Sequence, residues 1–207
     1  MRKIAESTVR RLSLYLRFLE EFDADGETTA SSAALAARGG TTSAQVRKDL
    51  SFFGSFGKRG LGYPIPALIA RLREILGLNH RYRVIVVGAG KIGSALVQYH
   101  GFKERGFDLA ALYDNDPKKV GREWAGVTVR DVAQLERDLH RRSADIAAIV
   151  TPAEAAQEIA DKLVKCGVSA ILNFAPVQVT VPETVAVKTV NLVLELEALS
   201  YALGARG

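Results

Sequence analysis

The sequence of 207 residues contains a single cysteine, Cys166, so an intramolecular disulfide is excluded and a cysteine-based metal cluster is not expected. It has no apolar run near the roughly 18 residues that cross a bilayer. The segment MRKIAESTVRRL has no apolar core of a signal peptide. These absences predict a cytoplasmic protein without a metal centre or a membrane anchor, long enough for one large or two smaller domains.

The excess of positive over negative charge is absent from the second part of the chain and lies in the first. Residues 1–83 contain 14 lysines and arginines against 8 acidic residues, whereas residues 84–207 contain 14 against 15. This asymmetry indicates a polyanionic partner for the first part. A chance imbalance on a solvated surface is the alternative.

The first part is predicted to be helical. Leucines and aromatic residues recur at helical spacing over residues 7–22, and Gly26 ends that pattern. A short alanine-rich helix follows, capped by Ser31 or Ser32 and closed by Gly39 and Gly40. A third helix begins at Thr42 or Ser43 and continues through the segment QVRKDLSFF. This order is typical of a helix-turn-helix unit.

The third helix has the two faces that a recognition helix needs. At about 100° per residue, Val46, Leu50 and Phe53 share the side that would pack on the domain. Small and hydrogen-bonding residues on the other side suit base edges in a major groove. An ordinary amphipathic helix with a solvated basic face is the alternative.

The glycine-rich segment GSFGKRGLGY favours the DNA-binding interpretation. Residues 57–60 can form a basic hairpin tip, and a helix followed by such a hairpin is typical of a winged helix. The residues predicted to contact DNA are Ser43, Ala44, Gln45, Arg47, Lys48, Ser51, Phe56, Lys58, Arg59 and Tyr63.

The second part begins with a nucleotide-binding pattern. The apolar run at residues 84–87 suits the centre of a parallel sheet. It is followed by Gly88, Gly90 and Gly93 in a G-x-G-x-x-G spacing, where strand should turn to helix. These glycines allow a tight turn, close approach of a pyrophosphate, and close packing of helix on strand.

A second strand supplies the context that this pattern needs. Residues 109–113 are apolar and end at Asp114, 21 residues after Gly93. A carboxylate there can accept both adenosine ribose hydroxyls and would repel a 2′-phosphate, which favours NAD over NADP. The alternative treats Asp114 and Asp116 as turn residues before Pro117.

Strands and helices alternate through the remaining sequence, as expected of a doubly wound α/β fold. Strands are predicted near 127–129, 144–152, 168–176 and 185–192, and helices near 131–141 and 153–167. Loops near Thr151-Pro152 and at residues 173–176 should line the cofactor crevice. The domains expected are a winged helix at 1–78, a Rossmann-type domain at 79–190, and a final apolar helix at 191–207 that packs on its own domain or on another subunit.

The lack of a recognisable catalytic group and of a substrate domain favours a regulator over an enzyme. His80, His100 and His140 are scattered, none is placed by spacing beside an acid or nucleophile, and no residues remain for a substrate domain. A DNA-reading module fused to an NAD-binding fold indicates a switch. An NAD-dependent oxidoreductase and a regulator of another nucleotide, such as a CoA ester, stay open, although Asp114 argues against the latter.

The chain resembles the Rex family of redox-sensing transcriptional repressors over nearly its whole length. The resemblance lies in QVRKDLSFFGSFGKRGLGY, VVGAGKIGSAL, YDNDPKKVG and ILNFAP, in this order. It implies a homodimer with an exchanged last helix that binds inverted-repeat operators, releases DNA when NADH binds, and permits binding when NAD⁺ competes. An apolar pocket at the dimer interface should prefer the neutral reduced ring.

The resemblance also implies roles for individual residues. Three coupling residues of the family correspond here to Arg17, Tyr99 and Asn191, where an aspartate is expected at the last position. An amide cannot form the ion pair, so stabilisation of the NAD⁺ state should be weaker. The residues predicted to hold the cofactor are Gly88, Ala89, Gly90, Lys91, Ile92, Gly93, Asp114, Asn115, Thr151, Pro152, Asn173, Phe174 and Ala175.

Overall fold

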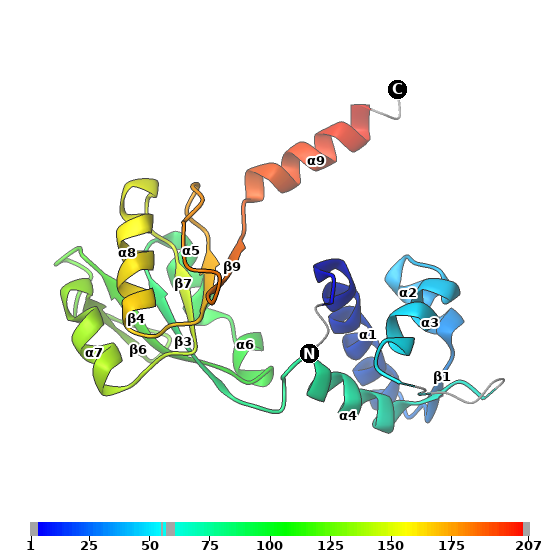
Figure 1. Cartoon of the computed structure of the whole chain (residues 1–207). Helices are drawn as coiled ribbons and strands as arrows, with labels where there is room; N and C mark the ends of the chain where they lie inside the picture. Colours follow the sequence, from blue (N-terminus) through cyan, green and yellow to red (C-terminus); the bar gives the residue numbers. More distant parts are fainter. Residues whose placement is uncertain (1–3, 55, 57–60, 205–207) are drawn as a thin grey trace. The chain divides into compact units, whose positions relative to one another are not determined.

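The computed structural model describes residues 4–54, 56 and 61–204 (Figure 1). The chain divides into two compact units, residues 1–80 and 81–207, which are described separately below. The predicted boundaries after residues 78 and 190 stay a prediction.

Among its described residues, the first unit has four helices and a two-stranded antiparallel ribbon. Its elements are α1 (Glu6–Ala24), β1 (Thr29–Ala30), α2 (Ser32–Gly39), α3 (Ser43–Ser51), β2 (Tyr63–Pro64) and α4 (Ile65–Ile75). The Ser31 hydroxyl accepts from Ala34 N at 3.0 Å to cap α2, and the Thr42 hydroxyl accepts from Gln45 N at 3.2 Å to cap α3. Gly40 ends α2 in the left-handed conformation with φ of 57°.

The helical periodicity of the first unit is confirmed by its core. Three leucines of α1 pack against leucines and a valine of α3 and α4, and all of these residues are nearly inaccessible to solvent. They are Leu12, Leu16 and Leu19 of α1, Val46 and Leu50 of α3, and Leu68 and Leu72 of α4. The third helix is shorter than predicted: α3 ends at Ser51 instead of continuing through Phe53. Gly54 follows with φ of 124°, a conformation that helical residues do not adopt.

The second unit is built on a seven-stranded sheet in the order β5-β6-β4-β3-β7-β8-β9. All pairings are parallel except that of the edge strand β5 with β6. The strands are β3 (Tyr82–Val87), β4 (Phe107–Asp114), β5 (Glu123–Trp124), β6 (Val127–Asp131), β7 (Ile146–Ile149), β8 (Ala170–Asn173) and β9 (Ala186–Thr189). Apart from β5, this is the strand order of a dinucleotide-binding fold.

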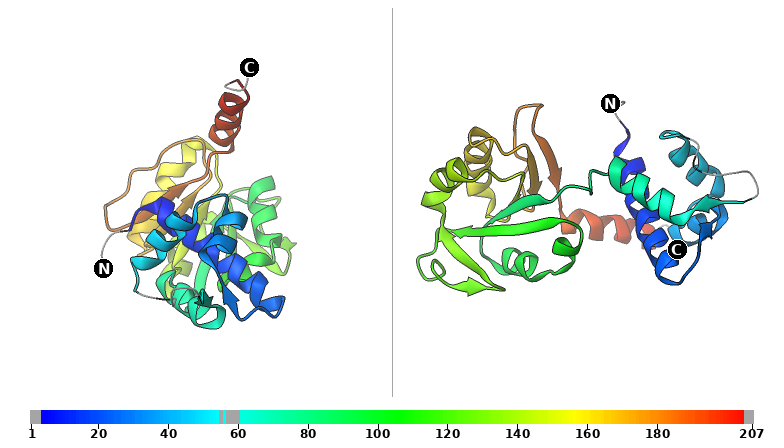
Figure 2. Two further views of the ribbon diagram at one scale, coloured as in Figure 1. Left: turned by 90° about the vertical axis from the view of Figure 1, so that its right-hand side faces the viewer. Right: turned by 90° about the horizontal axis from the view of Figure 1, so that it is seen from below.

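Helices cover both faces of the sheet (Figure 2). Ile85 and Val87 of the central strand face a cluster with Leu135 and Ile159, whereas Val86, between them, faces a cluster with Val97. The helices are α5 (Lys91–Gln98), α6 (Gly101–Glu104), a 3-10 turn (Val132–Gln134), α7 (Leu135–Arg141), α8 (Ala153–Lys165) and α9 (Leu192–Gly204). The predicted doubly wound architecture is confirmed.

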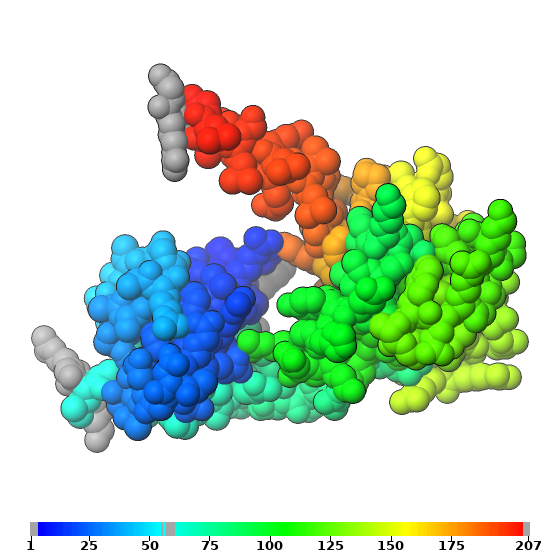
Figure 3. All heavy atoms as spheres, turned by 180° about the vertical axis from the view of Figure 1, so that it is seen from behind, coloured from blue at the N-terminus to red at the C-terminus, as the bar shows by residue number. Residues whose placement is uncertain are grey.

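The last helix, α9, has no buried residue among those described. Its leucines are 59–71% exposed and Tyr201 is 80% exposed. Figure 3 shows α9 in orange and red, without cover from the other elements of its own unit. None of the described helices combines the length and the apolar character needed to cross a membrane.

Candidate nucleotide site and DNA-reading surface

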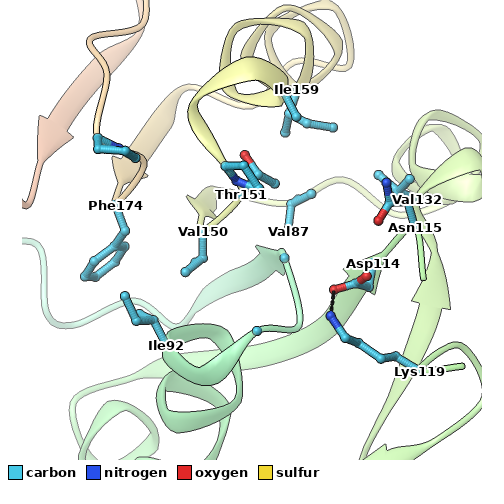
Figure 4. Close-up of a pocket in the computed structure, with 15 residues that line it drawn as sticks. Val87, Ile92, Asp114, Asn115, Lys119, Val132, Val150, Thr151, Ile159 and Phe174 are labelled. Atoms are coloured by element: carbon cyan, nitrogen blue, oxygen red, sulfur yellow. Dashed lines mark hydrogen bonds and ion pairs between the residues drawn. The ribbon is translucent and has the colours of Figure 1, made fainter.

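A cavity of about 480 Å³ opens at the carboxyl ends of the central strands. It lies where the chain crosses from one side of β3 to the other, the place at which open α/β sheets bind ligands. Figure 4 shows Asp114, Asn115 and Lys119 at one end, and Ile92, Val150 and Phe174 at the other. The lining residues are Val87, Gly88, Gly90, Ile92, Asp114, Asn115, Lys119, Val132, Val150, Thr151, Pro152, Ala155, Ile159, Phe174 and Pro176.

The three glycines of the motif have different physical reasons to be glycine. Gly88 has φ of 109°, and a Cβ there would overlap the carbonyl of Val150, which directly follows the neighbouring strand β7. A Cβ on Gly93 would overlap the carbonyl oxygen of Gly88, so this glycine lets α5 approach the strand. A Cβ on Gly90 would meet nothing within 4 Å. The open space at Gly90, which lines the cavity, leaves its backbone accessible to a ligand.

The N-terminus of α5 is available to an anion. Gly90 precedes the helix, and no described side chain caps its first turn. The first N–H groups of a helix carry partial positive charge and lack intrahelical acceptors. A pyrophosphate beside Gly90 would therefore receive hydrogen bonds here.

Asp114 lies at the end of β4 and is only 8% exposed. Its Oδ2 accepts from Ala89 N at 2.7 Å and from Lys119 Nζ at 3.1 Å, and its Oδ1 accepts from Asp116 N at 2.8 Å. Burial alone would raise the pKa of Asp114, but the two backbone N–H groups and Lys119 together hold it below its usual value. The site therefore presents an ionised carboxylate.

The structure brings most of the predicted cofactor residues to the cavity. Lys91 and Gly93 belong to the first turn of α5, and Ala89 donates to Asp114, but none of the three lines the cavity. Lys119 is a lining residue that the sequence interpretation missed, because its approach to Asp114 depends on the turn over residues 115–118. The predicted residues that do line the cavity are Gly88, Gly90, Ile92, Asp114, Asn115, Thr151, Pro152 and Phe174.

Asn173 and Ala175 contribute to the site differently from the prediction. Asn173 is fully buried and does not line the cavity. Its Oδ1 accepts from Ala175 N at 3.0 Å and its Nδ2 donates to Val177 O at 2.7 Å. Its amide is therefore occupied within the loop that follows β8.

Thr151 has a buried hydroxyl oxygen without a hydrogen-bond partner in the described part of the chain. It follows β7 and lines the middle of the cavity (Figure 4). A buried hydroxyl that lacks a partner is costly, so Thr151 is suited to bond a polar group of a bound ligand.

Some side chains that α3 was predicted to offer to DNA are exposed, and others are engaged in hydrogen bonds within the first unit. Ala44, Lys48 and Ser51 are exposed, as the prediction requires. Gln45 donates to Asp49 Oδ1 at 2.8 Å, and Arg47 donates to the Ser32 hydroxyl at 3.1 Å. Base contacts from the last two would require these bonds to be exchanged.

The remaining predicted DNA contacts lie after α3. Phe56 and Tyr63 are half-buried and pack against the helical core. Lys58 and Arg59, the tip of the predicted wing, lie outside the described residues. The role of these residues in DNA binding stays a prediction.

A buried carboxylate fastens α3 to α1. Asp49 is 1% exposed and receives Arg11 Nε at 2.6 Å, Arg11 Nη2 at 2.8 Å and the Tyr15 hydroxyl at 3.0 Å, besides Gln45. Burial alone would raise the pKa of Asp49, but these hydrogen bonds hold it below its usual value. Burial, aided by Asp49, raises the pKa of Tyr15 to about 12. The sequence interpretation missed this cluster, because Asp49 lies 38 residues from Arg11 and 34 from Tyr15 along the chain.

The three predicted coupling residues have local partners. Arg17 pairs with Glu21 at 3.5 Å, and its side chain is 68% exposed. Tyr99 is 62% exposed and meets Phe102 edge to face at 5.0 Å. The Asn191 Oδ1 accepts from Val193 N at 3.0 Å and Leu194 N at 3.4 Å, so Asn191 caps α9.

Comparison with known families divides the chain in the same way as its fold. Residues 3–51 match a family described as a putative DNA-binding protein N-terminus. Residues 79–177 match a family described as a CoA binding domain. Each match covers less than half of the chain.

Full-length relatives and solved structures are more informative. The chain is 47% identical over 199 residues to the redox-sensing transcriptional repressor Rex of Carboxydothermus hydrogenoformans, covering 96% of each protein. It is 46% identical over 201 residues to that of Thermus thermophilus, covering 97% of this chain and 94% of that protein.

A crystal structure of the repressor RSP with β-NAD⁺ and operator DNA matches with a TM-score of 0.94 and 36% identity, covering 100% of this chain and 95% of that one. The β-NADH complex of RSP matches with a TM-score of 0.89 and 35% identity, covering 100% and 97%. The chain therefore belongs to the Rex family of redox-sensing transcriptional repressors.

Proposed function

We propose that the protein represses transcription by binding operator DNA through its first unit and releases the DNA when NADH fills the cavity of its second unit. The observation that carries this proposal is the ionised Asp114 beside a glycine-lined cavity, in a chain whose first unit presents a helix-turn-helix. RSP has been crystallised with each redox form of the cofactor and with operator DNA, which supports the same function here. The family consists of repressors, so we do not assign hydride transfer.

The cavity supports a preference for the reduced cofactor. The end away from Asp114 is formed by apolar side chains, those of Ile92, Val150 and Phe174 (Figure 4). The only charged side chains among the described lining residues, those of Asp114 and Lys119, are at the other end. The oxidised nicotinamide ring carries a positive charge that would remain unpaired among these apolar groups, whereas the reduced ring is neutral. Such differential affinity is what a ligand needs to shift a conformational equilibrium.

We also propose that the protein acts as a homodimer through α9. This helix exposes apolar side chains on all sides, including Leu192, Leu196 and Leu199 at 60–65% exposure. An exposed apolar surface of this kind marks an interaction site. A second copy of the chain would cover it and would place two helix-turn-helix units to read an inverted repeat.

The decisive experiment is a titration of the protein bound to a labelled inverted-repeat operator with NADH and, separately, with NAD⁺. Release of DNA by NADH at concentrations where NAD⁺ has no effect would support the proposal. DNA binding that responds to neither nucleotide would mean that the cavity senses another ligand, and a CoA ester should then be tried. Failure to bind DNA at low salt, where phosphate contacts are strongest, would overturn the proposal.

A further inference from the structure

The segment between β8 and β9 contributes to the cavity but contains no helix or strand. It runs from Phe174 to Val185. Phe174 and Pro176 both line the cavity, and Phe174 lies at its apolar end (Figure 4). Backbone N–H and C=O groups outside regular structure need other partners. Two side-chain amides supply several of them.

Asn173 organises the first turn of this segment from inside the protein. Its amide bridges Ala175 N and Val177 O, so that Pro176 lies between the two bonded groups and Phe174 lies directly before them. Because Ala175 N can only donate and Val177 O can only accept, these partners fix which way the amide points. The Phe174 N–H donates to Ile149 O at 2.8 Å, which ties the start of the turn to β7.

Gln157 holds the middle of the segment from α8. Its Oε1 accepts from Thr180 N at 2.8 Å and its Nε2 donates to Thr180 O at 2.9 Å. One side-chain amide therefore satisfies both backbone groups of a single residue, as a neighbouring strand would. Asp161 accepts from the same Nε2 at 2.8 Å, which restricts the Gln157 rotamer.

The same helix forms a wall of the cavity. Ala155 and Ile159, two residues before and after Gln157, both line it. Thus α8 presents apolar side chains to the cavity and an amide to the segment that carries Phe174 and Pro176. Val179 and Val181 also pack against the core and support the segment by burial.

We propose that Gln157 and Asn173 are positioning residues, which place Phe174 and Pro176 at the nicotinamide end of the cofactor without contacting it. This inference rests on the proposed NADH site and deepens it. It assigns affinity for the nicotinamide half to amides outside the cavity, whereas Asp114 and Gly90 serve the adenosine and pyrophosphate half. Loss of either amide should therefore weaken NADH binding and spare a ligand that contains only the adenosine diphosphate half.

The test compares Gln157→Met with Glu158→Met in the full chain, using calorimetric titration with NADH and with ADP. Glu158 is the next residue of α8, is 70% exposed and pairs only with Lys162 among the contacts described, so it is a matched control. We expect Gln157→Met to lose about threefold to tenfold in NADH affinity, since an exposed pair of hydrogen bonds is removed. ADP affinity should stay within about twofold of wild type. The Glu158→Met variant should bind both ligands as wild type does.

Two further variants separate positioning from a general loss of structure. Gln157→Glu keeps the acceptor for Thr180 N and loses the donor to Thr180 O, so its NADH affinity should lie between those of wild type and Gln157→Met. Asn173→Asp likewise keeps the acceptor for Ala175 N, and its NADH affinity should fall further than its ADP affinity. Equal losses for NADH and ADP, or no loss in Gln157→Met, would overturn the inference. A wild-type protein that binds neither ligand would instead overturn the proposed cofactor site.

Discussion

The ammonium of Lys119 lies 3.1 Å from Oδ2 of Asp114, at the end of the cavity where the adenosine ribose is expected. With Ala89 N and Asp116 N, it brings the donors on this carboxylate to three. A carboxylate has about four acceptor positions, so a ribose diol must share or displace some of these bonds. Lys119 also offsets part of the negative charge that would repel a 2′-phosphate.

Replacing Lys119 should therefore sharpen discrimination against NADPH. In Lys119→Met we expect NADPH affinity to fall about fivefold to tenfold relative to NADH, because the full charge of Asp114 then faces the phosphate. In Asp114→Asn the difference between the affinities for NADH and for NADPH should become smaller. Calorimetric titration of both variants with both cofactors checks this, and parallel changes for NADH and NADPH in Lys119→Met would contradict it.

Asp49→Asn should destabilise the first unit selectively. The substitution removes the charge that Arg11 pairs with and disturbs the bonds from Tyr15 and Gln45, at an expected cost of about 3 kcal/mol. Urea unfolding followed by far-UV circular dichroism should show an earlier transition. The fluorescence of Trp124, the only tryptophan, reports on the second unit and should keep its midpoint.

Asp23→Asn, at an exposed position near the end of α1, is the control for that experiment. It should change stability by less than about 0.5 kcal/mol. Equal unfolding midpoints for Asp49→Asn and Asp23→Asn would show that the Asp49 cluster does not stabilise the first unit. The same would follow if Asp49→Asn moved the Trp124 fluorescence transition together with the circular-dichroism transition.

The same cluster predicts how stability depends on pH. The pKa of Asp49 is lowered in the folded state, so the unfolded state binds its proton first as the pH falls. The stabilisation is complete above about pH 4, the usual aspartate value, and is lost as the pH falls through the lower folded value. Tyr15 has a raised pKa of about 12, so its contribution is present below about pH 10 and lost as the pH rises. Urea unfolding midpoints measured across pH should therefore fall less steeply toward acid pH in Asp49→Asn than in wild type. Toward alkaline pH they should fall less steeply in Tyr15→Phe than in wild type.

Asn191→Asp should strengthen the state that binds NAD⁺ and DNA. The carboxylate can replace the amide as the cap of α9, because both offer an oxygen to Val193 N and Leu194 N. It also restores the negative charge that the family resemblance leads us to expect for an ion pair. We predict roughly threefold to tenfold tighter NAD⁺ binding, in the range of a charged hydrogen bond. Asn191→Ser keeps a cap without charge and should leave NAD⁺ affinity unchanged. If Asn191→Asp alters neither NAD⁺ affinity nor operator affinity, the idea that the amide weakens coupling is removed.

Polar substitutions on α9 should separate the proposed subunits. Leu196→Ser combined with Leu199→Ser removes two large apolar groups that are 65% and 60% exposed in the single chain. We expect the dimer dissociation constant to rise at least about a hundredfold, at roughly 1.5 kcal/mol or more for each leucine. Sedimentation velocity measures this directly, with Glu195→Gln on the same helix as the control. A wild-type protein that sediments as a single chain at micromolar concentration would contradict the dimer.

Local sequence patterns predicted the fold well because its decisive signals are local. The apolar run before Gly88 and the apolar run before Asp114 became the neighbouring central strands β3 and β4, and the glycine spacing placed the turn into α5.

The features of the site that the sequence did not predict depend on contacts or turns that leave no local pattern in the sequence. Asp49 falls in a helix whose other charged residues are solvated, and its partners in α1, Arg11 and Tyr15, lie 38 and 34 residues away along the chain. Asn173 was predicted to lie near the cofactor, but its amide turns into the loop that follows β8, where it bonds Ala175 N and Val177 O. Lys119 depends on a turn, whose conformation has no simple periodic signature.

The shared carboxylate of Asp49 also bears on how such a repressor can change its operator over evolution. Arg11, Tyr15 and Gln45 all bond to this one group, so the effects of replacing them will not add, and any single change leaves the others with a disturbed partner. The exposed residues of the same helix, Ala44, Lys48 and Ser51, are not members of this cluster. Under the proposed role of α3 in reading DNA, we expect single substitutions at these three exposed positions to alter base preference at a lower cost in stability than substitutions in the Asp49 cluster.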